Sequence, residues 1–197
     1  MRAPAVTVYF VRHGETDWNR AQRYQGQRDI PLNATGRAQA ARNGRALALA
    51  LGGNAGALDY VASPLVRARE TMEIMRREIG LARDGYGTDD RLREIHYGHW
   101  EGELWGELPV KDPHGFAARE ADKWGWQPQG GESYRALSER VADWLDDLER
   151  DVIVAAHGGI MRVLRGLSAG LGPAEMFALD VPQDKVLVIE AGCSRWL

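Results

Sequence analysis

Short apolar runs and amphipathic helical patterns alternate along this chain of 197 residues. Four apolar runs rich in β-branched and aliphatic residues are predicted strands: residues 6–11, 58–62, 151–156 and 185–190. Apolar residues at three- and four-residue spacing predict helices in other segments: residues 36–52, 65–79, 134–148 and 160–169. Strands that alternate with amphipathic helices indicate an α/β sandwich with a largely parallel central sheet.

Capping residues predict where several of these helices begin. Asn33 is a suitable N-cap for the first helix, because its side chain can accept a hydrogen bond from the first turn. Ser63 is the predicted N-cap of the second helix, with Pro64 at the first helical position. The Gly-Pro pair at 172–173 predicts a further short helix, and the residues after Glu190 are predicted to form a short tail.

Two stretches follow neither pattern. Residues 17–32 are polar and contain Gly and Pro, which predicts a loop. Residues 100–131 hold four of the seven tryptophans and three of the eight prolines, and we predict an irregular insertion there. This insertion either covers the end of the sheet as a cap and substrate wall or forms a small satellite core. With no repeat and no linker in the sequence, residues 1–197 are predicted to form one domain.

The composition is ordinary for a globular domain, with 44% apolar and 27% charged residues. A net charge of −3 gives no reason to expect nucleic acid or an anionic membrane as a partner. Cys193 is the only cysteine, which excludes an internal disulfide, and we expect a reducing, cytoplasmic location. No apolar run has the length of a membrane span or the pattern of a signal peptide. The sequence leaves the oligomeric state open, a homodimer included.

Side chains suited to binding an anion follow the predicted strands. Arg12 and His13 end the first strand, and His157 and Gly158 follow a later one. Arg67 lies in the first turn of a predicted helix, where a cation opposes the helix dipole. Because ligands of open α/β sheets bind outside the carboxyl ends of the strands, we expect these side chains to share one site. Taken alone, a strand that ends in Arg12 and His13 is more often an ordinary exit into a loop.

The motifs of several other enzyme classes are absent from the sequence. It contains no His-Glu-x-x-His or cysteine cluster for a metal, no Walker or dinucleotide glycine motif, and no Gly-x-Ser-x-Gly. The chain does offer two histidines, two arginines and Glu94, a carboxyl group placed among apolar residues. Two guanidinium groups can hold a phosphoryl group, a neutral imidazole can attack phosphorus, and a carboxylic acid can protonate the leaving alkoxide. This set suffices for phosphomonoester transfer without a metal or another cofactor.

Six motifs, spread over the chain in a fixed order, resemble those of a known family. They are residues 11–16 with 18–19, 26–40, 63–68 with 71, 92–95 with 98 and 100–102, 130–133, and 156–159. Together they resemble the histidine phosphatase superfamily, the phosphoglycerate-mutase-like proteins, and within it the phosphatase branch. The resemblance implies a three-layer α/β/α sandwich with a mainly parallel central sheet, which agrees with the periodicity.

The resemblance also implies a role for each residue of the site. His13 would be the nucleophile that becomes phosphohistidine, and Glu94 would be the acid–base residue. The phosphoryl group would be clamped by three further side chains: Arg12, Arg67 and His157. Other phosphate contacts would come from two loops: Asn19, Gln25, Gly26 and Gly158. No metal and no other cofactor would take part, and three nearby charged residues would be scaffold: Glu15, Glu132 and Arg162.

The resemblance covers both phosphatases and mutases. A mutase must grip a second acidic group on its substrate, and the phosphoglycerate mutases use an arginine pair in an insertion for this. Residues 103–128 provide Lys111, Arg119 and Lys123 but no adjacent arginines. We therefore expect hydrolysis of a small phosphomonoester, with an apolar or flat part of the leaving group against the aromatic insertion. A 2,3-bisphosphoglycerate-dependent phosphoglycerate mutase and a catalytically silent phosphate-binding or scaffold module are the alternatives.

Overall fold

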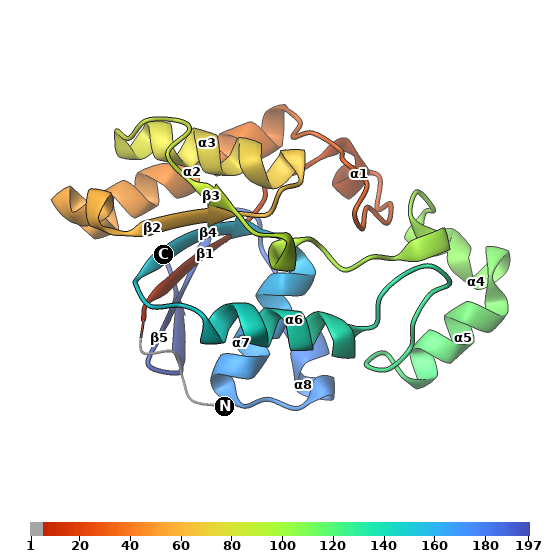
Figure 1. The fold of residues 1–197 in the computed structure, drawn as a ribbon. Helices are drawn as coiled ribbons and strands as arrows, with labels where there is room; N and C mark the ends of the chain where they lie inside the picture. Colours follow the sequence, from red (N-terminus) through yellow and green to blue (C-terminus); the bar gives the residue numbers. More distant parts are fainter. Residues whose placement is uncertain (1–5) are drawn as a thin grey trace.

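The computed structural model describes residues 6–197, which form a six-stranded sheet flanked by helices (Figure 1). The strands, in the spatial order β3-β2-β4-β1-β5-β6, are β1 (Val8–Arg12), β2 (Asp59–Ala62), β3 (Gly87–Thr88), β4 (Val152–Ala156), β5 (Val186–Glu190) and β6 (Cys193–Trp196). The first four are parallel to one another, whereas β5 runs antiparallel to β1 and β6 antiparallel to β5. The prediction of a mainly parallel central sheet is therefore confirmed.

Helices cover both faces of this sheet. The flanking helices are α2 (Ala34–Leu51) and α3 (Val66–Ile79) on one face, and α6 (Tyr134–Asp146), α7 (Gly158–Ala169) and α8 (Pro173–Ala178) on the other (Figure 1). Neighbouring residues of β1 point to opposite layers, as the pleat of a strand requires. Phe10 packs in the core under α6 and α7, and Val11 packs in the core under α2 and α3. The three-layer α/β/α sandwich is thus confirmed.

The two edge strands lie where the sequence predicts no strand. β3 is two residues long, and β6 occupies the predicted tail, paired with β5 from Glu190↔Cys193 to Leu187↔Trp196. A two-residue turn joins β5 to β6, with Ala191 and Gly192 both at positive φ. Because the first three residues of β6 are exposed, this edge strand carries no apolar run that a sequence pattern would detect.

The start of α3 differs from the prediction at Ser63. Asn33 does cap α2, since its side chain accepts a hydrogen bond from the Gly36 N–H at 2.9 Å. Helix α3, however, begins at Val66, and its N-cap is Leu65, whose side chain accepts no hydrogen bond. The pairing of β2 with β4 continues through Ser63, whose N–H donates to the Ala155 carbonyl, so the chain cannot turn into the helix there. The Ser63 side chain is consequently available for another contact.

Short helices occupy both stretches predicted to be loop or irregular. They are α1 (Asp17–Arg20), α4 (Leu108–Lys111) and α5 (Pro113–Ala121), with a 3₁₀ turn at Trp105–Glu107. Further 3₁₀ turns lie at Gly52–Ala57, Asp90–Leu92 and Gly98–Trp100. Asp112 caps α5 by accepting from the Gly115 N–H, and it also accepts from the Trp100 indole N–H at 2.8 Å. Trp100 is buried and packs on Trp126, with ring centroids 4.3 Å apart. The prediction of an irregular insertion over residues 100–131 was therefore wrong for α4 and α5. The Asp112-Pro113 pair that starts α5 is a helix signal that the prediction did not use.

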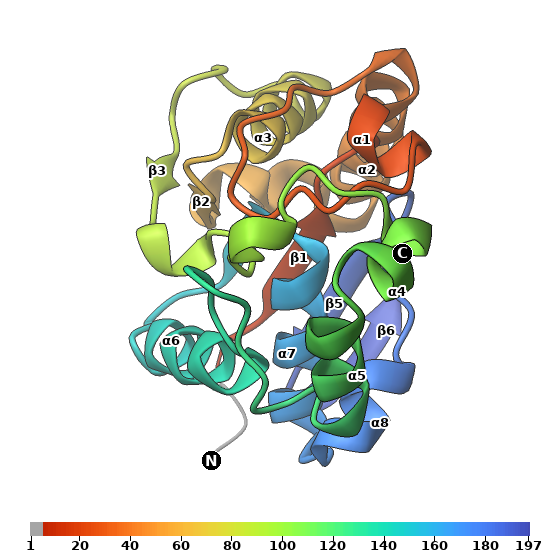
Figure 2. The same ribbon diagram turned by 90° about the vertical axis from the view of Figure 1, so that its right-hand side faces the viewer.

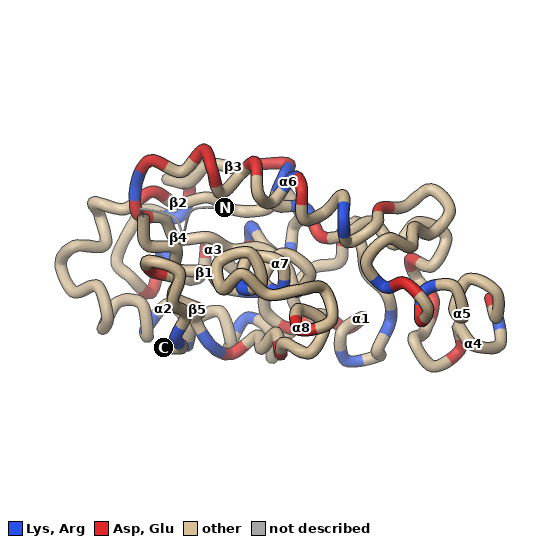
Figure 3. Tube along the Cα trace, turned by 90° about the horizontal axis from the view of Figure 1, so that it is seen from below, with Lys and Arg blue, Asp and Glu red and all other residues tan. Residues whose placement is uncertain are grey.

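Helices α1, α4 and α5 lie at the end of the molecule toward which β1 points (Figure 2). This end holds the carboxyl ends of the parallel strands, where the sequence predicts the site. Acidic and basic residues are interspersed along the surface segments rather than forming one continuous band (Figure 3). Among the helices of residues 6–197, none has the length and apolarity needed to cross a lipid bilayer.

Candidate active site

The parallel sheet brings the two predicted histidines into contact. His13 follows β1, and its backbone N–H donates to the carbonyl of Ala156, the last residue of the neighbouring β4, at 2.8 Å. His157 follows Ala156 and occupies the N-cap position of α7. The two imidazole rings meet edge to face, with centroids 5.2 Å apart, and both side chains are buried. Residues separated by more than 140 positions thus form one cluster because their strands are adjacent.

The surroundings of His13 fix which ring nitrogen can act as a nucleophile. Nδ1 lies 2.8 Å from the Gly14 carbonyl oxygen, which can only accept a hydrogen bond, so Nδ1 carries the proton. Nε2 therefore has a free lone pair, and in this structure it accepts from the Arg67 Nε–H at 3.2 Å. Burial, reinforced by the charges of Arg67 and Arg12, lowers the pKa of His13 well below its ordinary value. The imidazole is therefore neutral at physiological pH, which is the form that can attack phosphorus.

Arg67 is held by backbone carbonyl groups instead of carboxylates. Its side chain is fully buried, and its two Nη atoms donate to the carbonyl oxygens of Gly26 and Arg28, both at 2.7 Å. Burial lowers the pKa of Arg67 to about 10, which still leaves the group charged at neutral pH. Since both contacts are to neutral carbonyls, the positive charge stays available for an anion.

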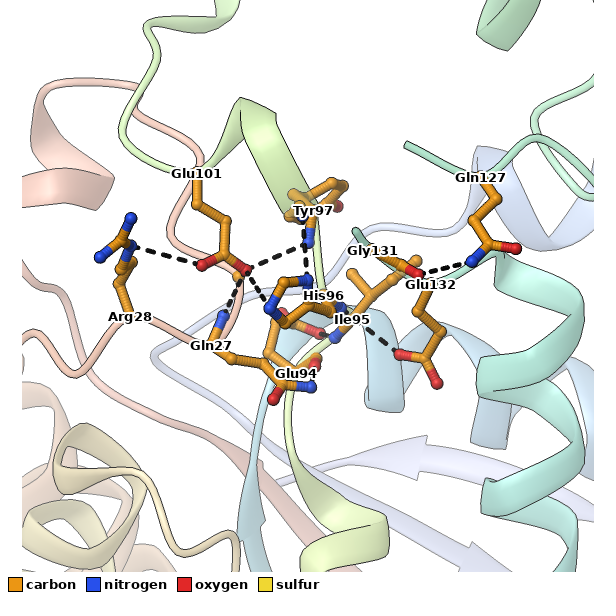
Figure 4. A network of polar contacts seen from close by, with 12 residues as sticks. Gln27, Arg28, Glu94, Ile95, His96, Tyr97, Glu101, Gln127, Gly131 and Glu132 are labelled. Atoms are coloured by element: carbon orange, nitrogen blue, oxygen red, sulfur yellow. Dashed lines mark hydrogen bonds and ion pairs between the residues drawn. The ribbon is translucent and has the colours of Figure 1, made fainter. Parts of the chain in front are cut away.

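The loop that carries these carbonyls is fastened by Glu101 (Figure 4). One carboxylate oxygen of Glu101 accepts from the Gln27 N–H at 2.8 Å and from the Tyr97 N–H at 3.2 Å. The other forms an ion pair with Arg28 at 3.6 Å. The Gln27 side chain in turn donates to the Glu94 carbonyl at 3.1 Å. Glu101 thereby joins the loop that orients Arg67 to the segment that carries Glu94.

Arg12 and Glu94 both lie against the start of α7, beside Gly158 and Gly159 respectively. Arg12 donates through Nη1 to the Val181 carbonyl at 2.7 Å, while its buried Nε has no hydrogen-bond partner among the described residues. Burial lowers the pKa of Arg12 from its ordinary value. The Glu94 carboxyl group accepts from the N–H groups of Gly159 and Ile95, each at 3.0 Å. The N-terminus of α7 thus orients the predicted acid–base residue.

A cavity at this end of the sheet is lined by eight of the nine predicted residues: Arg12, His13, Asn19, Gln25, Gly26, Arg67, Glu94 and Gly158. The side-chain oxygens of Asn19 and Gln25 accept hydrogen bonds, from Gln183 before β5 and from Thr16 respectively. Their amide N–H groups are therefore free to donate to an anion. His157 is the predicted residue that does not line the cavity, because it lies fully buried against His13.

Nearly all of the described chain matches one family. Residues 8–197 match the model of the histidine phosphatase superfamily, branch 1. The chain belongs to this superfamily.

Two curated members of this superfamily illustrate the similarity. A glucosyl-3-phosphoglycerate phosphatase of Mycobacterium tuberculosis is 34% identical over 177 residues, which cover 83% of this chain and 74% of the relative. A metal-independent phosphoserine phosphatase of Arabidopsis thaliana is 34% identical over 170 residues, which cover 83% of this chain and 69% of the relative. A solved structure of mycobacterial glucosyl-3-phosphoglycerate phosphatase in complex with VO3 has a TM-score of 0.76 at 32% identity, covering 98% of this chain and 96% of the other.

The cavity of this histidine phosphatase superfamily member also includes residues that the sequence analysis did not assign to it. They are Arg23, Tyr24, Tyr97, Trp105, Tyr134, Gly159, Arg162 and Val181. Arg162, predicted to be scaffold, donates to the Tyr134 hydroxyl at 3.2 Å, and its buried Nε has no partner among the described residues. Arg162 stands four residues after Gly158 on α7, so helical spacing alone places both on one face. That spacing is the signal that could have identified it.

An adjoining hollow shares several of these residues and extends the site toward the insertion. It adds Arg119, Lys123 and Phe177 to a wall of Tyr24, Tyr97, Trp105, Tyr134 and Arg162. Glu120 pairs with both Arg119 and Lys123, whereas no described carboxylate lies within ion-pair distance of Arg162. Among the described residues that line the cavity and the hollow, Glu94 is the one acid beside six cations. The site is therefore cationic within a protein of net charge −3, as an anion-binding site requires.

Proposed function

We propose that this protein is a metal-independent phosphomonoester hydrolase that acts through a phosphohistidine at His13. The observation that carries the proposal is the neutral His13 ring, whose Nδ1–H is bound to Gly14 and whose Nε2 lone pair lies beside the Arg67 guanidinium. Nε2 attacks phosphorus in line and forms the N–P bond while the ester P–O bond breaks. Glu94, as a carboxylic acid, gives its proton to the leaving alkoxide.

The second half of the reaction releases phosphate. The Glu94 carboxylate, on the cavity wall, takes a proton from water while the water oxygen bonds to phosphorus and the N–P bond breaks. His13 returns to the neutral form, and Glu94 again holds a proton. Among residues 6–197, no group of three or more His, Cys, Asp or Glu side chains is arranged to hold a metal ion, and the proposed steps use none.

The remaining predicted residues stabilise charge on the phosphoryl oxygens. Arg12 and Arg67 neutralise the oxygens, with Asn19 and Gln25 as neutral donors beside them. The Gly158 N–H at the start of α7 adds a further donor, because the first N–H groups of a helix have no intrahelical acceptor. The complex of the mycobacterial relative with VO3 supports this proposal, since vanadium oxyanions resemble a phosphoryl group in shape and charge.

The walls of the site favour a small ester whose leaving group carries an anionic part. Aromatic rings line the route from His13 to the hollow, and Arg119, Lys123 and Arg162 supply positive charge there. The named substrates of the two curated relatives, a glucosyl phosphoglycerate and phosphoserine, both combine a phosphate ester with a carboxylate. The predicted apolar or flat leaving group would explain the aromatic residues of the wall but not its positive charges.

A phosphoglycerate mutase is the second candidate. Arg119 and Lys123 are not adjacent in the sequence, yet both line the same hollow as Arg162, so a grip on a second acidic group is available. A catalytically silent binding module is disfavoured, because four of the five predicted catalytic residues line one cavity and the fifth, His157, packs against His13. The small-molecule phosphomonoester partner, the cytoplasmic location and a homodimer stay predictions.

Phosphate release from p-nitrophenyl phosphate tests the hydrolase. The wild-type protein should release phosphate, and His13→Ala should reduce the rate by about 10⁴-fold or more, as for other lost nucleophiles. Labelled enzyme should yield an acid-labile, alkali-stable phosphoprotein. Equal rates for wild type and His13→Ala would refute the nucleophile. Rapid phosphoglycerate isomerisation that depends on 2,3-bisphosphoglycerate, with slow phosphate release, would favour the mutase instead.

A further inference from the structure

Ser63 and His157 form a buried pair at the floor of the site. The Ser63 hydroxyl lies 2.7 Å from His157 Nε2, and both residues are fully buried. Each follows a strand, β2 and β4, and these two strands are neighbours in the sheet, so the contact is built on rigid elements. The other ring nitrogen of His157, Nδ1, is buried and has no hydrogen-bond partner among the described residues.

The direction of this hydrogen bond follows from the other contact of Ser63. The Leu65 backbone N–H donates to the Ser63 oxygen at 3.4 Å, so one oxygen lone pair already has a donor. If His157 Nε2–H also donated to that oxygen, the Ser63 hydroxyl proton would have no acceptor within the buried pair. If the Ser63 O–H donates to Nε2, the hydroxyl proton has a partner and its oxygen still accepts from Leu65. Each arrangement leaves one buried donor without a described partner, the Ser63 hydroxyl in the first and the His157 Nδ1–H in the second. The second is favoured because Nδ1–H belongs to the ring that contacts His13, where a phosphoryl oxygen can accept from it.

The bond from Ser63 determines the tautomer of His157. Burial, with the charges of Arg67 and Arg12, lowers the pKa of His157 well below its ordinary value, so the ring is neutral. A neutral imidazole carries one proton, and a ring that accepts at Nε2 must hold it at Nδ1. The unpartnered nitrogen is then a donor. In the opposite tautomer a lone pair would occupy this position, and it would repel a phosphoryl oxygen on His13.

We propose that Ser63 is a positioning residue that holds His157 as the Nδ1–H tautomer, so that Nδ1 donates to the phosphoryl group on His13. This inference rests on the proposed function, because it concerns the phosphoryl group that His13 receives. Ser63 does not cap α3, which starts three residues later at Val66, so its hydroxyl is available to His157.

Nitrogen NMR of the ring tests the tautomer without any turnover. In wild-type protein labelled with ¹⁵N-histidine, the signals of His157 should show a protonated Nδ1 and an unprotonated Nε2. A His157→Gln sample assigns these signals among the five histidines. Ser63→Ala should shift them toward the Nε2–H form, and Ser63→Thr, which keeps a hydroxyl, should restore the wild-type pattern. A wild-type spectrum with a protonated Nε2 would overturn the proposal, even if Ser63→Ala failed to fold.

Inhibitor binding and turnover test whether the contact between Ser63 and His157 matters for function. Ser63→Ala should weaken inhibition by orthovanadate and lower kcat/KM for p-nitrophenyl phosphate by roughly 10- to 100-fold, less than complete loss of an oxyanion donor. Ser63→Thr should recover most of both values. The matched control is Ser138→Ala, which removes a buried hydroxyl on α6 that does not touch His157. Unchanged vanadate inhibition and kcat/KM in Ser63→Ala would refute the role.

These readings separate the inference from the proposed function. A wild-type protein that releases no phosphate from any ester, yet shows the Nδ1–H form of His157, would refute the hydrolase while leaving the tautomer assignment intact. An active wild-type enzyme whose Ser63→Ala variant changes tautomer but keeps its activity would refute the inference alone.

Discussion

The strand-end cluster around His13 and the wall of the adjoining hollow, to which residues 100–131 contribute Trp105, Arg119 and Lys123, meet at one cavity but are built differently. The cluster consists of buried side chains held by backbone groups and by one another, as Arg67 is by Gly26, Arg28 and His13. The wall consists of partly exposed aromatic and charged side chains, and Trp105 is 47% exposed. The cluster has one available geometry, whereas the wall can change residue by residue without unfolding the sheet. We infer that the cluster sets the chemistry and the wall sets the choice of substrate.

The largest expected effect comes from altering the cluster without removing its charge. Arg67→Lys keeps a cation but cannot contact both carbonyls and His13 at once, because an ammonium lacks the planar fork. We expect kcat/KM for p-nitrophenyl phosphate to fall about 10²- to 10³-fold. Arg23→Lys, on the cavity rim, is the matched control and should lose far less. Similar losses in both variants would mean that the cluster is not more constrained than the rim.

The next largest effect is expected on stability and concerns the loop whose carbonyl groups bind Arg67. Gly26 has φ of +50°, and a Cβ there would overlap the Glu101 carboxylate. Gly26→Ala should lower the free energy of unfolding by about 3 kcal/mol, from backbone strain and overlap together. Gly130 also has positive φ, at +70°, but a Cβ there meets nothing within 4 Å. Gly130→Ala should therefore cost only about 1 kcal/mol in a urea titration, and equal costs would contradict the packing argument.

The buried histidines should make the stability depend on pH. The folded-state pKa of both His13 and His157 is depressed, so below about pH 6.5 the unfolded chain binds protons that the folded protein does not. The free energy of unfolding should fall as the pH drops below that value, by about 1.4 kcal/mol per pH unit for each histidine. Denaturant titrations from pH 7 to 5 should show a shallower slope for His157→Gln.

The insertion supplies the control for this pH dependence. His114 lies exposed on α5, away from the cluster. His114→Gln should keep the wild-type slope. If His157→Gln and His114→Gln gave the same slope as wild type, the cluster would not be the source of the pH dependence.

The smallest expected effect concerns substrate choice by the wall. 3-Phosphoglycerate and glycerol 3-phosphate differ only in a carboxylate, so the ratio of their kcat/KM values reports on recognition of the anionic part. Arg119→Gln should lower this ratio about tenfold, or 1.4 kcal/mol, and leave glycerol 3-phosphate hydrolysis nearly unchanged. Arg195→Gln removes an exposed arginine on β6 and should leave the ratio at the wild-type value. If the ratio for the wild-type enzyme were near one, the wall would play no part in substrate choice.

The comparison of prediction and structure follows the same division. The motif around Arg12 and His13 could be predicted because a strand end fixes both residue order and position. The role of Ser63 was assigned wrongly, because a serine before a proline fits a helix cap as well as a strand end. Arg162 was missed because its helical spacing from Gly158, which places both residues on one face of α7, was not used. The helix signal of α5 was missed within the tryptophan-rich insertion, although Asp112 and Pro113 mark the start of this helix.

The sequence by itself determined the α/β architecture, the superfamily and the identities of the reactive side chains, because local periodicity and strand-end motifs encode them. Only the tertiary structure decided how these side chains are connected. The fold brings Ser63 into contact with His157, which lies 94 positions further along the chain. It likewise brings His13 into contact with Arg67, which lies 54 positions further along. Such contacts depend on which strands are neighbours and how far each strand extends, and no local pattern carries that information. The tautomer of His157 follows from such a long-range contact, whereas that of His13 is set by the carbonyl of the adjacent Gly14.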